Sequence, residues 1–177
     1  GVRKKRAFTI MKSIYKPLYL RDFPLISTDP ESAEIIKYAS NAFLATKISF
    51  INEMAHLCEK VGGDIKEVSK GMGLDKRIGD KFLHAGAGYG GSCFPKDTAA
   101  ILKIAKENDL ALDIIEAVIN VNQRVKLRMI DKIKQILSNR IEGKTVVFFG
   151  VTFKPNTDDM REAPSLVIIP ELIKQGA

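Results

Sequence analysis

Residues 29–63 read DPESAEIIKYASNAFLATKISFINEMAHLCEKVGG, and this run sets the expected architecture. Asp29 is a typical N-cap, and Pro30 suits the first helical position. No further Pro or Gly occurs before Gly62 and Gly63, which are typical of a helix end. The pattern predicts a helix of about 32 residues, roughly 48 Å long. Because this length exceeds one small core, it indicates a connector between domains or a subunit interface.

The flanking sequence predicts further helices and two strands. A helix is expected over residues 3–16 and a short strand at Phe23–Ile26. The run Lys144–Gly150 is rich in β-branched and aromatic residues, so it predicts a buried strand. Downstream helices are expected at Asp64–Lys70, at Asp75–Asp80, from Pro95, from Ala111 to Arg140, and after Ala163-Pro164. The expected fold class is a mostly α central domain built on two long helices, with remnants of α/β domains at both ends.

Composition limits the classes of protein. The 177 residues are 45% apolar and 28% charged, which is typical of a folded chain. The net charge of +7 comes from residues 1–21, so no nucleic-acid partner is expected. The longest uncharged run, residues 82–95, is too short and too rich in glycine to span a membrane. With no secretory signal at the start and two cysteines, we expect a cytoplasmic, reducing location.

Cys93 is the first candidate for chemistry. It follows the glycine-rich stretch Gly86–Gly91 and precedes a helix whose first turn contains Pro95. The free N–H groups of a helix N-terminus stabilise a thiolate. Lys96 adds positive charge nearby, and Asp97 could orient a water or accept a proton. The alternative is that Cys93 is a small buried apolar residue, as most free cysteines are; Cys58, in mid-helix, is interpreted in that way.

Other polar positions are less specific. The glycine stretch could bind an anion, but it is neither a P-loop nor a dinucleotide fingerprint placed after a strand, and a flexible turn is the alternative. Lys37 and Asn41 lie four residues apart on one helix face, where they could hold a substrate oxygen or simply face solvent. His56 and His84 lack the spacing of metal ligands, so no metal site is expected.

Together, four segments resemble the UDP-glucose 6-dehydrogenases of the UDP-glucose/GDP-mannose dehydrogenase family. Residues 29–47 resemble their long central helix, and Gly73–Gly79 followed by Gly86–Asp97 resembles their catalytic loop. Phe153–Glu162 resembles the entry to their third domain. The resemblance implies oxidation of the sugar C6 alcohol of UDP-glucose to a carboxylate, with NAD as cofactor, and a homodimer formed through the long helix.

The resemblance also implies roles for individual residues. Cys93 attacks the C6 aldehyde to give a thiohemiacetal, which is oxidised to a thioester that water hydrolyses. Lys37 stabilises the oxyanion, while Asn41 and Asp97 position water and substrate oxygens. Lys96 and Arg161 lie toward NAD. The implied substrate-binding residues are Arg77, acting in a neighbouring subunit, and Phe82, Leu83, His84, Ala85, Gly86, Gly90 and Lys154.

Finally, the resemblance divides the chain into three parts. Residues 1–28 resemble the C-terminal remnant of an NAD-binding Rossmann domain, 29–142 the central helical domain for dimerisation and catalysis, and 143–177 the start of a UDP-sugar-binding α/β domain. We therefore expect the chain by itself to lack activity. A GDP-mannose or UDP-N-acetylmannosamine dehydrogenase fragment is one alternative, although residues 42–52 and 76–79 favour UDP-glucose. A non-catalytic helical dimerisation module is the other.

Overall fold

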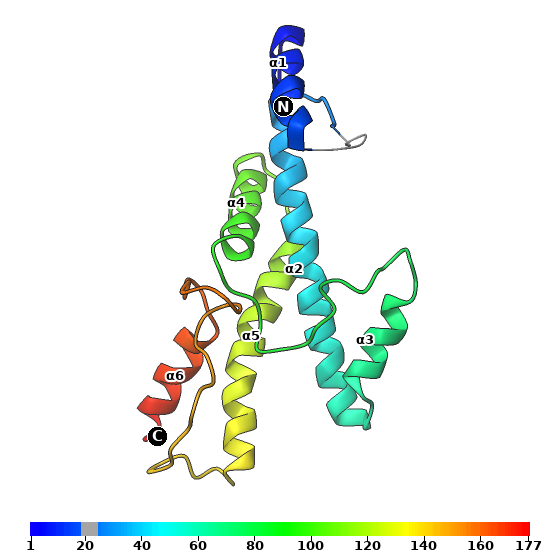
Figure 1. Ribbon diagram of the computed structural model, residues 1–177. Coiled ribbons are helices and arrows are strands. Elements are labelled where there is room, and N and C mark those ends of the chain that lie inside the picture. Colours follow the sequence, from blue (N-terminus) through cyan, green and yellow to red (C-terminus); the bar gives the residue numbers. More distant parts are fainter. Residues whose placement is uncertain (19–24) are drawn as a thin grey trace. The chain divides into compact units, whose positions relative to one another are not determined.

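The computed structural model describes residues 1–18 and 25–177, which divide into two compact units, Gly1–Ser40 and Asn41–Ala177 (Figure 1). The first unit contains α1 (Lys5–Tyr15), the 3-10 helix η1 (Lys16–Leu18) and the first turns of α2 (Pro30–Val61). The helix predicted over residues 3–16 is thereby confirmed. Of the strand predicted at Phe23–Ile26, the first two residues lie outside the described part, and Leu25 and Ile26 are in no strand.

Helix α2 begins and ends at the residues that the sequence predicts. The carboxylate of Asp29 accepts hydrogen bonds from the Ser32 amide at 2.7 Å and from the Ser32 hydroxyl at 2.9 Å, which caps the helix. At the other end, Gly62 adopts a φ of +82°, and its amide donates to the Cys58 carbonyl at 2.8 Å. Local chemistry at the two ends therefore sets the length of this helix.

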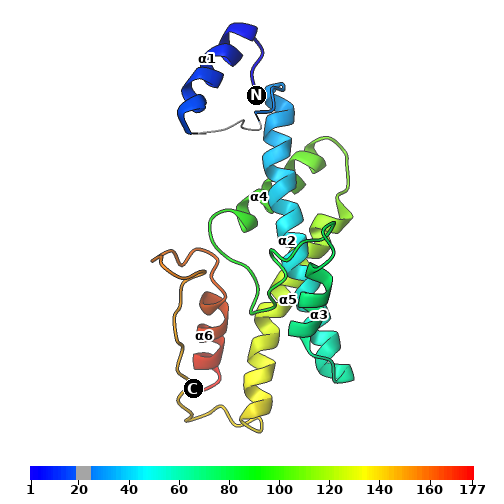
Figure 2. The ribbon, with the colours of Figure 1, turned by 45° about the vertical axis from the view of Figure 1, so that its right-hand side comes forward.

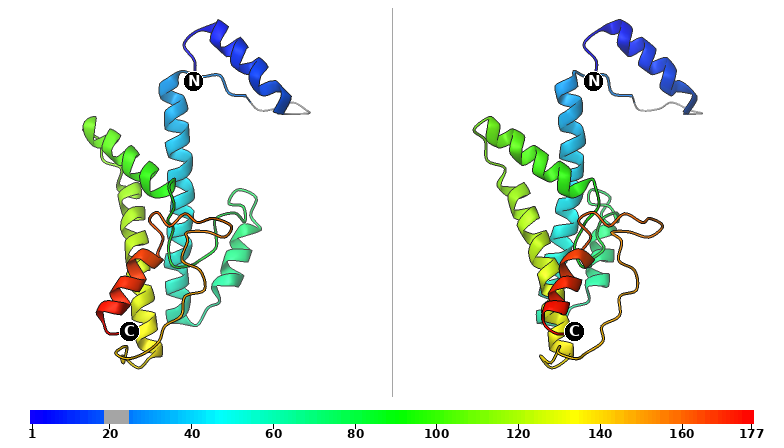
Figure 3. Two further views of the ribbon diagram at one scale, coloured as in Figure 1. Left: turned by 60° about the vertical axis from the view of Figure 1, so that its left-hand side comes forward. Right: turned by 90° about the vertical axis from the view of Figure 1, so that its left-hand side faces the viewer.

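The second unit is built from the rest of α2 and four further helices, α3 (Ile65–Gly73), α4 (Phe94–Glu107), α5 (Asp113–Ile136) and α6 (Ser165–Lys174). Helices α4 and α6 both pack against α5, as the views in Figures 2 and 3 also show. The core between α5 and α6 contains Ile130, Ile141, Ile168 and Leu172.

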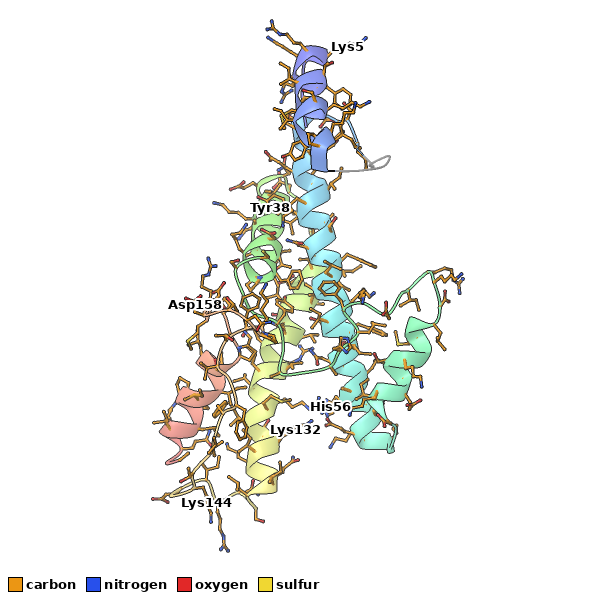
Figure 4. The ribbon with its side chains drawn as sticks, viewed as in Figure 1. Lys5, Tyr38, His56, Lys132, Lys144 and Asp158 are labelled. Carbon is orange, nitrogen blue, oxygen red and sulfur yellow. The ribbon has the colours of Figure 1, made fainter. Side chains whose placement is uncertain are left out.

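Charged residues line a groove where α2 faces α5. Arg128 and Lys132 of α5 are both ion-paired with Glu59 of α2, and Arg124 lies 3.5 Å from Glu53. His56 lines the same groove, with Lys132 opposite (Figure 4). These pairs join the two long helices of this unit beyond their apolar contacts.

Two predicted elements are wrong. Lys144–Gly150 is not a strand, and the described residues contain no strand at all, so α/β remnants are not seen. A strand needs a neighbouring strand for its backbone hydrogen bonds, and none is present in this part of the chain. Asp75–Asp80 is a set of turns, because the Asp75 carboxylate accepts from the Arg77 amide at 2.9 Å and so competes with helical bonding. None of the described helices is long and apolar enough for a membrane span.

Candidate active site

A cavity of about 620 Å³ in the second unit is lined by two of the residues that the sequence predicts to be catalytic, Cys93 and Asn41. Its wall comes from α2, from the loop between α3 and α4, from the start of α4, and from the segment before α6. The residues that line it are Asn41, Leu44, Ile48, Phe82, His84, Gly88, Tyr89, Gly90, Cys93, Phe94, Phe153 and Lys154.

Cys93 stands at the N-cap position of α4 and is exposed to this cavity. Its carbonyl accepts the first helical hydrogen bond, from the Asp97 amide at 2.8 Å, and its sulfur lies 3.8 Å from the Ser92 hydroxyl. The alternative that Cys93 is a buried apolar residue is therefore wrong, whereas Cys58, 8% exposed, has that character. A thiolate at this position faces the positive end of the α4 dipole.

Asp97 is 1% exposed and joins α4 to α2 through hydrogen bonds. Its carboxylate accepts from the Asn41 side-chain amide at 2.5 Å and from the Lys96 ammonium at 2.5 Å. A buried carboxylate needs such donors, because desolvation otherwise disfavours its charge. Asn41 lines the cavity and Asp97 does not, so Asp97 orients the amide that faces the cavity.

Two buried asparagines are hydrogen-bonded to the backbone of the glycine loop. Asn52 of α2 accepts from the Gly86 amide at 2.8 Å. Asn122 of α5 accepts from the Tyr89 amide at 2.8 Å and donates to the Tyr89 carbonyl at 3.1 Å. An asparagine side chain can pair with a backbone amide as another peptide group would. The sequence interpretation missed both residues, although a polar amide among the apolar positions of a helix was an available signal.

An aromatic group forms the apolar wall of the cavity. The ring of Phe94 meets Phe82 edge to face at 6.0 Å and Tyr89 at 5.8 Å. Burial raises the pKa of Tyr89, so its phenol stays neutral. In the segment before α6, the ammonium of Lys154 lies 5.3 Å from the centre of the Phe153 ring. Of these aromatic residues, sequence reasoning named only Phe82.

The segment before α6 closes over the glycine loop. The Gly91 amide donates to the Arg161 carbonyl at 2.7 Å, and the Arg161 guanidinium donates to the Asp159 carboxylate at 2.7 Å. These bonds from Arg161 lower the pKa of Asp159 to about 2. The pKa of Arg161 is raised, chiefly by its hydrogen bond to Asp159 and to a smaller degree by Cys93. The backbone of Arg161 is therefore held beside Gly91, two residues before Cys93.

The structure gathers some of the predicted residues and separates others. Those lining the cavity are Asn41, Phe82, His84, Gly90, Cys93 and Lys154. The remaining ones lie elsewhere: Leu83 and Ala85 line a second hollow beside α3, Gly86 is held by Asn52, and Lys96 and Arg161 are exposed.

Arg77 and Lys37 also lie outside this cavity. Arg77 is exposed, and its guanidinium is hydrogen-bonded to the Asp75 carboxylate at 2.6 Å. Lys37 belongs to the first unit and is exposed there. No group of three metal-ligating side chains occurs within residues 1–18 and 25–177.

The geometry defines a helical module that carries an exposed cysteine in an aromatic-walled cavity, and comparison with known proteins places it. Two family models match, one described as "UDP-glucose/GDP-mannose dehydrogenase family, central domain" over residues 31–124 and one described as "UDP-glucose/GDP-mannose dehydrogenase family, UDP binding domain" over residues 147–177. The chain belongs to the UDP-glucose/GDP-mannose dehydrogenase family.

Individual relatives agree with this placement. The UDP-glucose 6-dehydrogenase of Rhizobium meliloti is 50% identical over 97% of this chain, and that of Rickettsia bellii is 51% identical over 99%. The solved UDP-glucose dehydrogenase of Pyrobaculum islandicum superposes with a TM-score of 0.93 at 40% identity over the whole chain. In each case the chain spans about 40% of the relative's length, between 39% and 41%.

Proposed function

We propose that this chain is the cysteine-bearing part of an NAD-dependent dehydrogenase that oxidises UDP-glucose to UDP-glucuronate. The observation that carries the proposal is the exposed Cys93 at the N-cap of α4, inside a cavity, in a chain of this family. The substrate is proposed because two relatives with half of their aligned residues identical are named UDP-glucose 6-dehydrogenases.

In the proposed reaction Cys93 is the nucleophile. The C6 alcohol first loses a hydride and a proton and becomes the aldehyde. The Cys93 sulfur then forms a bond to C6, the C=O double bond becomes a single bond, and the thiol proton passes to that oxygen to give the thiohemiacetal. Loss of a second hydride from C6 and of the hydroxyl proton gives the thioester. Water then attacks C6, the C–S bond breaks, one proton of the water restores the thiol, and the other is released as the carboxylate forms. Asn41, positioned by Asp97, donates a hydrogen bond toward the reacting oxygens, and Lys37 is proposed to stabilise the oxyanion at C6.

The proposed substrate contacts follow the cavity. Phe82, His84, Gly90 and Lys154 contact the nucleotide sugar directly. Leu83, Ala85 and Gly86 shape the loop that carries these contacts, and Arg77 reaches the substrate of a neighbouring subunit.

The cofactor needs residues that the described part of the chain does not provide. A dinucleotide pyrophosphate binds where a glycine turn joins a strand to a helix, and residues 1–18 and 25–177 include no strand. These residues do not form an NAD site by themselves. When bound, NAD supplies the acceptor for hydride. We propose that the exposed cations Lys96 and Arg161 face its phosphates.

The domain plan is proposed on the same basis. Residues 29–142 form the central domain, with 1–28 ending the NAD domain and 143–177 beginning the UDP-sugar domain. The two matched ranges, 31–124 and 147–177, fall inside the second and third of these parts. By this plan the 177-residue chain alone does not reduce NAD.

The test measures NADH formation with UDP-glucose in a polypeptide of the relatives' length that contains this segment. Cys93→Ser is expected to abolish formation of the acid, and Cys58→Ser, the matched control, is expected to retain it. Faster turnover of GDP-mannose or UDP-N-acetylmannosamine would reassign the substrate. Undiminished acid formation by Cys93→Ser would overturn the mechanism. Reduction of NAD by the isolated chain, above its own Cys93→Ser variant, would overturn the domain plan.

A further inference from the structure

Lys126 of α5 is a buried cation that the proposed chemistry does not use. Its side chain is 1% exposed, and burial lowers the pKa of Lys126, an effect that the Glu162 carboxylate partly offsets. Its ammonium donates to the Glu162 carbonyl at 3.3 Å and lies 3.8 Å from the Glu162 carboxylate. Burying an ammonium costs several kcal/mol before pairing is counted. Apolar packing of α5 therefore does not account for a lysine here.

The partner of Lys126 has an unusual backbone. Glu162 has a φ of +53°, in the left-handed region that non-glycine residues seldom adopt. Such a conformation persists where surrounding contacts hold it. The carbonyl and the carboxylate of Glu162 both face Lys126, so this lysine supplies two of the contacts that fix the turn.

The turn at Glu162 is pressed against the glycine loop. A Cβ at Gly90 would lie 2.4 Å from the Glu162 carbonyl oxygen, so the two backbones touch. The next amide of the loop, that of Gly91, donates to the Arg161 carbonyl at 2.7 Å. Holding Glu162 therefore also holds Arg161, and Gly91 is only two residues before Cys93.

We propose that Lys126 is a positioning residue that fixes the turn at Glu162 on the glycine loop, so that Arg161 stays in place against Gly91 and its positive charge stays within reach of Cys93, two residues further on. Lys126 touches neither the cavity nor the sulfur; it acts through Arg161. The importance of Lys126 for catalysis rests on the proposed function, whereas its contacts with Glu162 do not.

The test compares alkylation of Cys93 by iodoacetate and by iodoacetamide. Both reagents react with the thiolate, so the ratio of their rates cancels its ionisation and reports the local positive charge that attracts the anionic reagent. Peptide mass spectrometry separates Cys93 from Cys58. Lys126→Met is expected to lower the ratio by about threefold, the effect of one unit charge several ångströms away in water. Lys132→Met, on the same helix and paired with Glu59, is expected to leave it unchanged.

A double-mutant cycle separates positioning from the charge of Lys126 itself. If Lys126 acts through Arg161, Lys126→Met lowers the ratio in the wild type but not in an Arg161→Gln background. An equal fall in both backgrounds, or no fall in either, would overturn the proposal.

A second variant keeps the test decisive if Lys126→Met fails to fold by circular dichroism. The Glu162 side chain is largely exposed, and glycine tolerates the positive φ, so Glu162→Gly removes the carboxylate that pairs with Lys126 and leaves the carbonyl contact in place. Its effect on the ratio is then expected to depend on Arg161, and strict additivity with Arg161→Gln would contradict the proposal. These alkylation rates are independent of NAD reduction, so the proposed function and this proposal can fail separately.

Discussion

At the scale of single residues, the buried Asp97 carboxylate is the polar centre of the site. It accepts short hydrogen bonds from Asn41 on another helix and from the adjacent Lys96. Since Asp97 is 1% exposed, water cannot replace a donor that is removed. Asn41 therefore serves both the stability of the fold and the orientation of the site.

Asn41→Ala tests this double role. Loss of the donor leaves the carboxylate of Asp97 under-bonded, so the free energy of unfolding is expected to fall by about 1–3 kcal/mol, measured by urea denaturation. Asn120→Ala, at an exposed position of α5, is the matched control and is expected to change it by less than about 0.5 kcal/mol. Equal effects of the two variants would contradict a buried hydrogen bond to Asp97.

The lowered pKa of Asp159 makes the stability of the folded state depend on pH. Hydrogen bonds from Arg161 lower its pKa from 3.8 to about 2, so the ionised form stabilises the folded state above pH 3.8. That contribution is lost as the pH falls from 3.8 toward 2. Asp159→Asn is expected to melt below the wild type at pH 7, with a gap that closes over this range in thermal denaturation. A gap independent of pH would show that the ion pair is not its source.

The position of Cys93 at a helix start was predictable because its signal is local. A cysteine between a glycine stretch and a helix start can be recognised from residues 86–97 alone. Asn52 and Asn122 were not predictable in the same way, since their importance depends on which loop the fold brings over them. The aromatic wall was missed for a similar reason: Phe94 and Tyr89 look like ordinary core residues until their rings face one cavity.

At the scale of elements, the long helices were predictable, whereas the short helix expected at Asp75–Asp80 and the strand expected at Lys144–Gly150 are not observed. Both ends of helix α2 could be predicted to the residue, because the capping Asp29 and the terminating Gly62 lie directly beside the ends that they determine. The run Lys144–Gly150 has the composition of a strand, but strand formation depends on a distant partner. The residue composition of a segment shows that it can form a strand, but it forms one only where another strand pairs with it.

The glycine loop and the turn at Glu162 form a second element whose fit can be tested. A Cβ at Gly90 meets the Glu162 carbonyl oxygen at 2.4 Å, whereas a Cβ at Gly86 meets nothing within 4 Å. Gly90→Ala is expected to lower the free energy of unfolding by about 1–3 kcal/mol through overpacking. Gly86→Ala, four residues away, is expected to stay within about 0.5 kcal/mol of the wild type. Urea denaturation measures both, and a tolerant Gly90 would mean that the turn does not press on the loop.

At the scale of the whole molecule, assembly is proposed to proceed through α2. Phe43, Phe50 and Leu57 are exposed and recur every seven residues, so they share one side of the helix. Exposed apolar stripes of this kind are typical of interfaces between copies. The homodimer proposed on the family resemblance gives this stripe a partner.

Sedimentation of the 177-residue chain tests the dimer. The wild type is expected to sediment as a dimer, and Phe50→Glu as a monomer, because a carboxylate cannot be buried in an apolar interface without a partner. Phe50→Leu preserves the apolar character and is expected to remain dimeric. A monomeric wild type at micromolar concentration would remove the role of this helix in assembly.

The unpaired run Lys144–Gly150 has one more consequence. Val147 is exposed, and Phe149 is 101% exposed, in a run that belongs to no helix or strand and has no strand beside it among the described residues. Such a segment is a template for cross-β stacking with identical copies. In concentrated solutions of this chain, insoluble fibrils would therefore start here, and a lysine in place of Phe149 would keep the preparation clear.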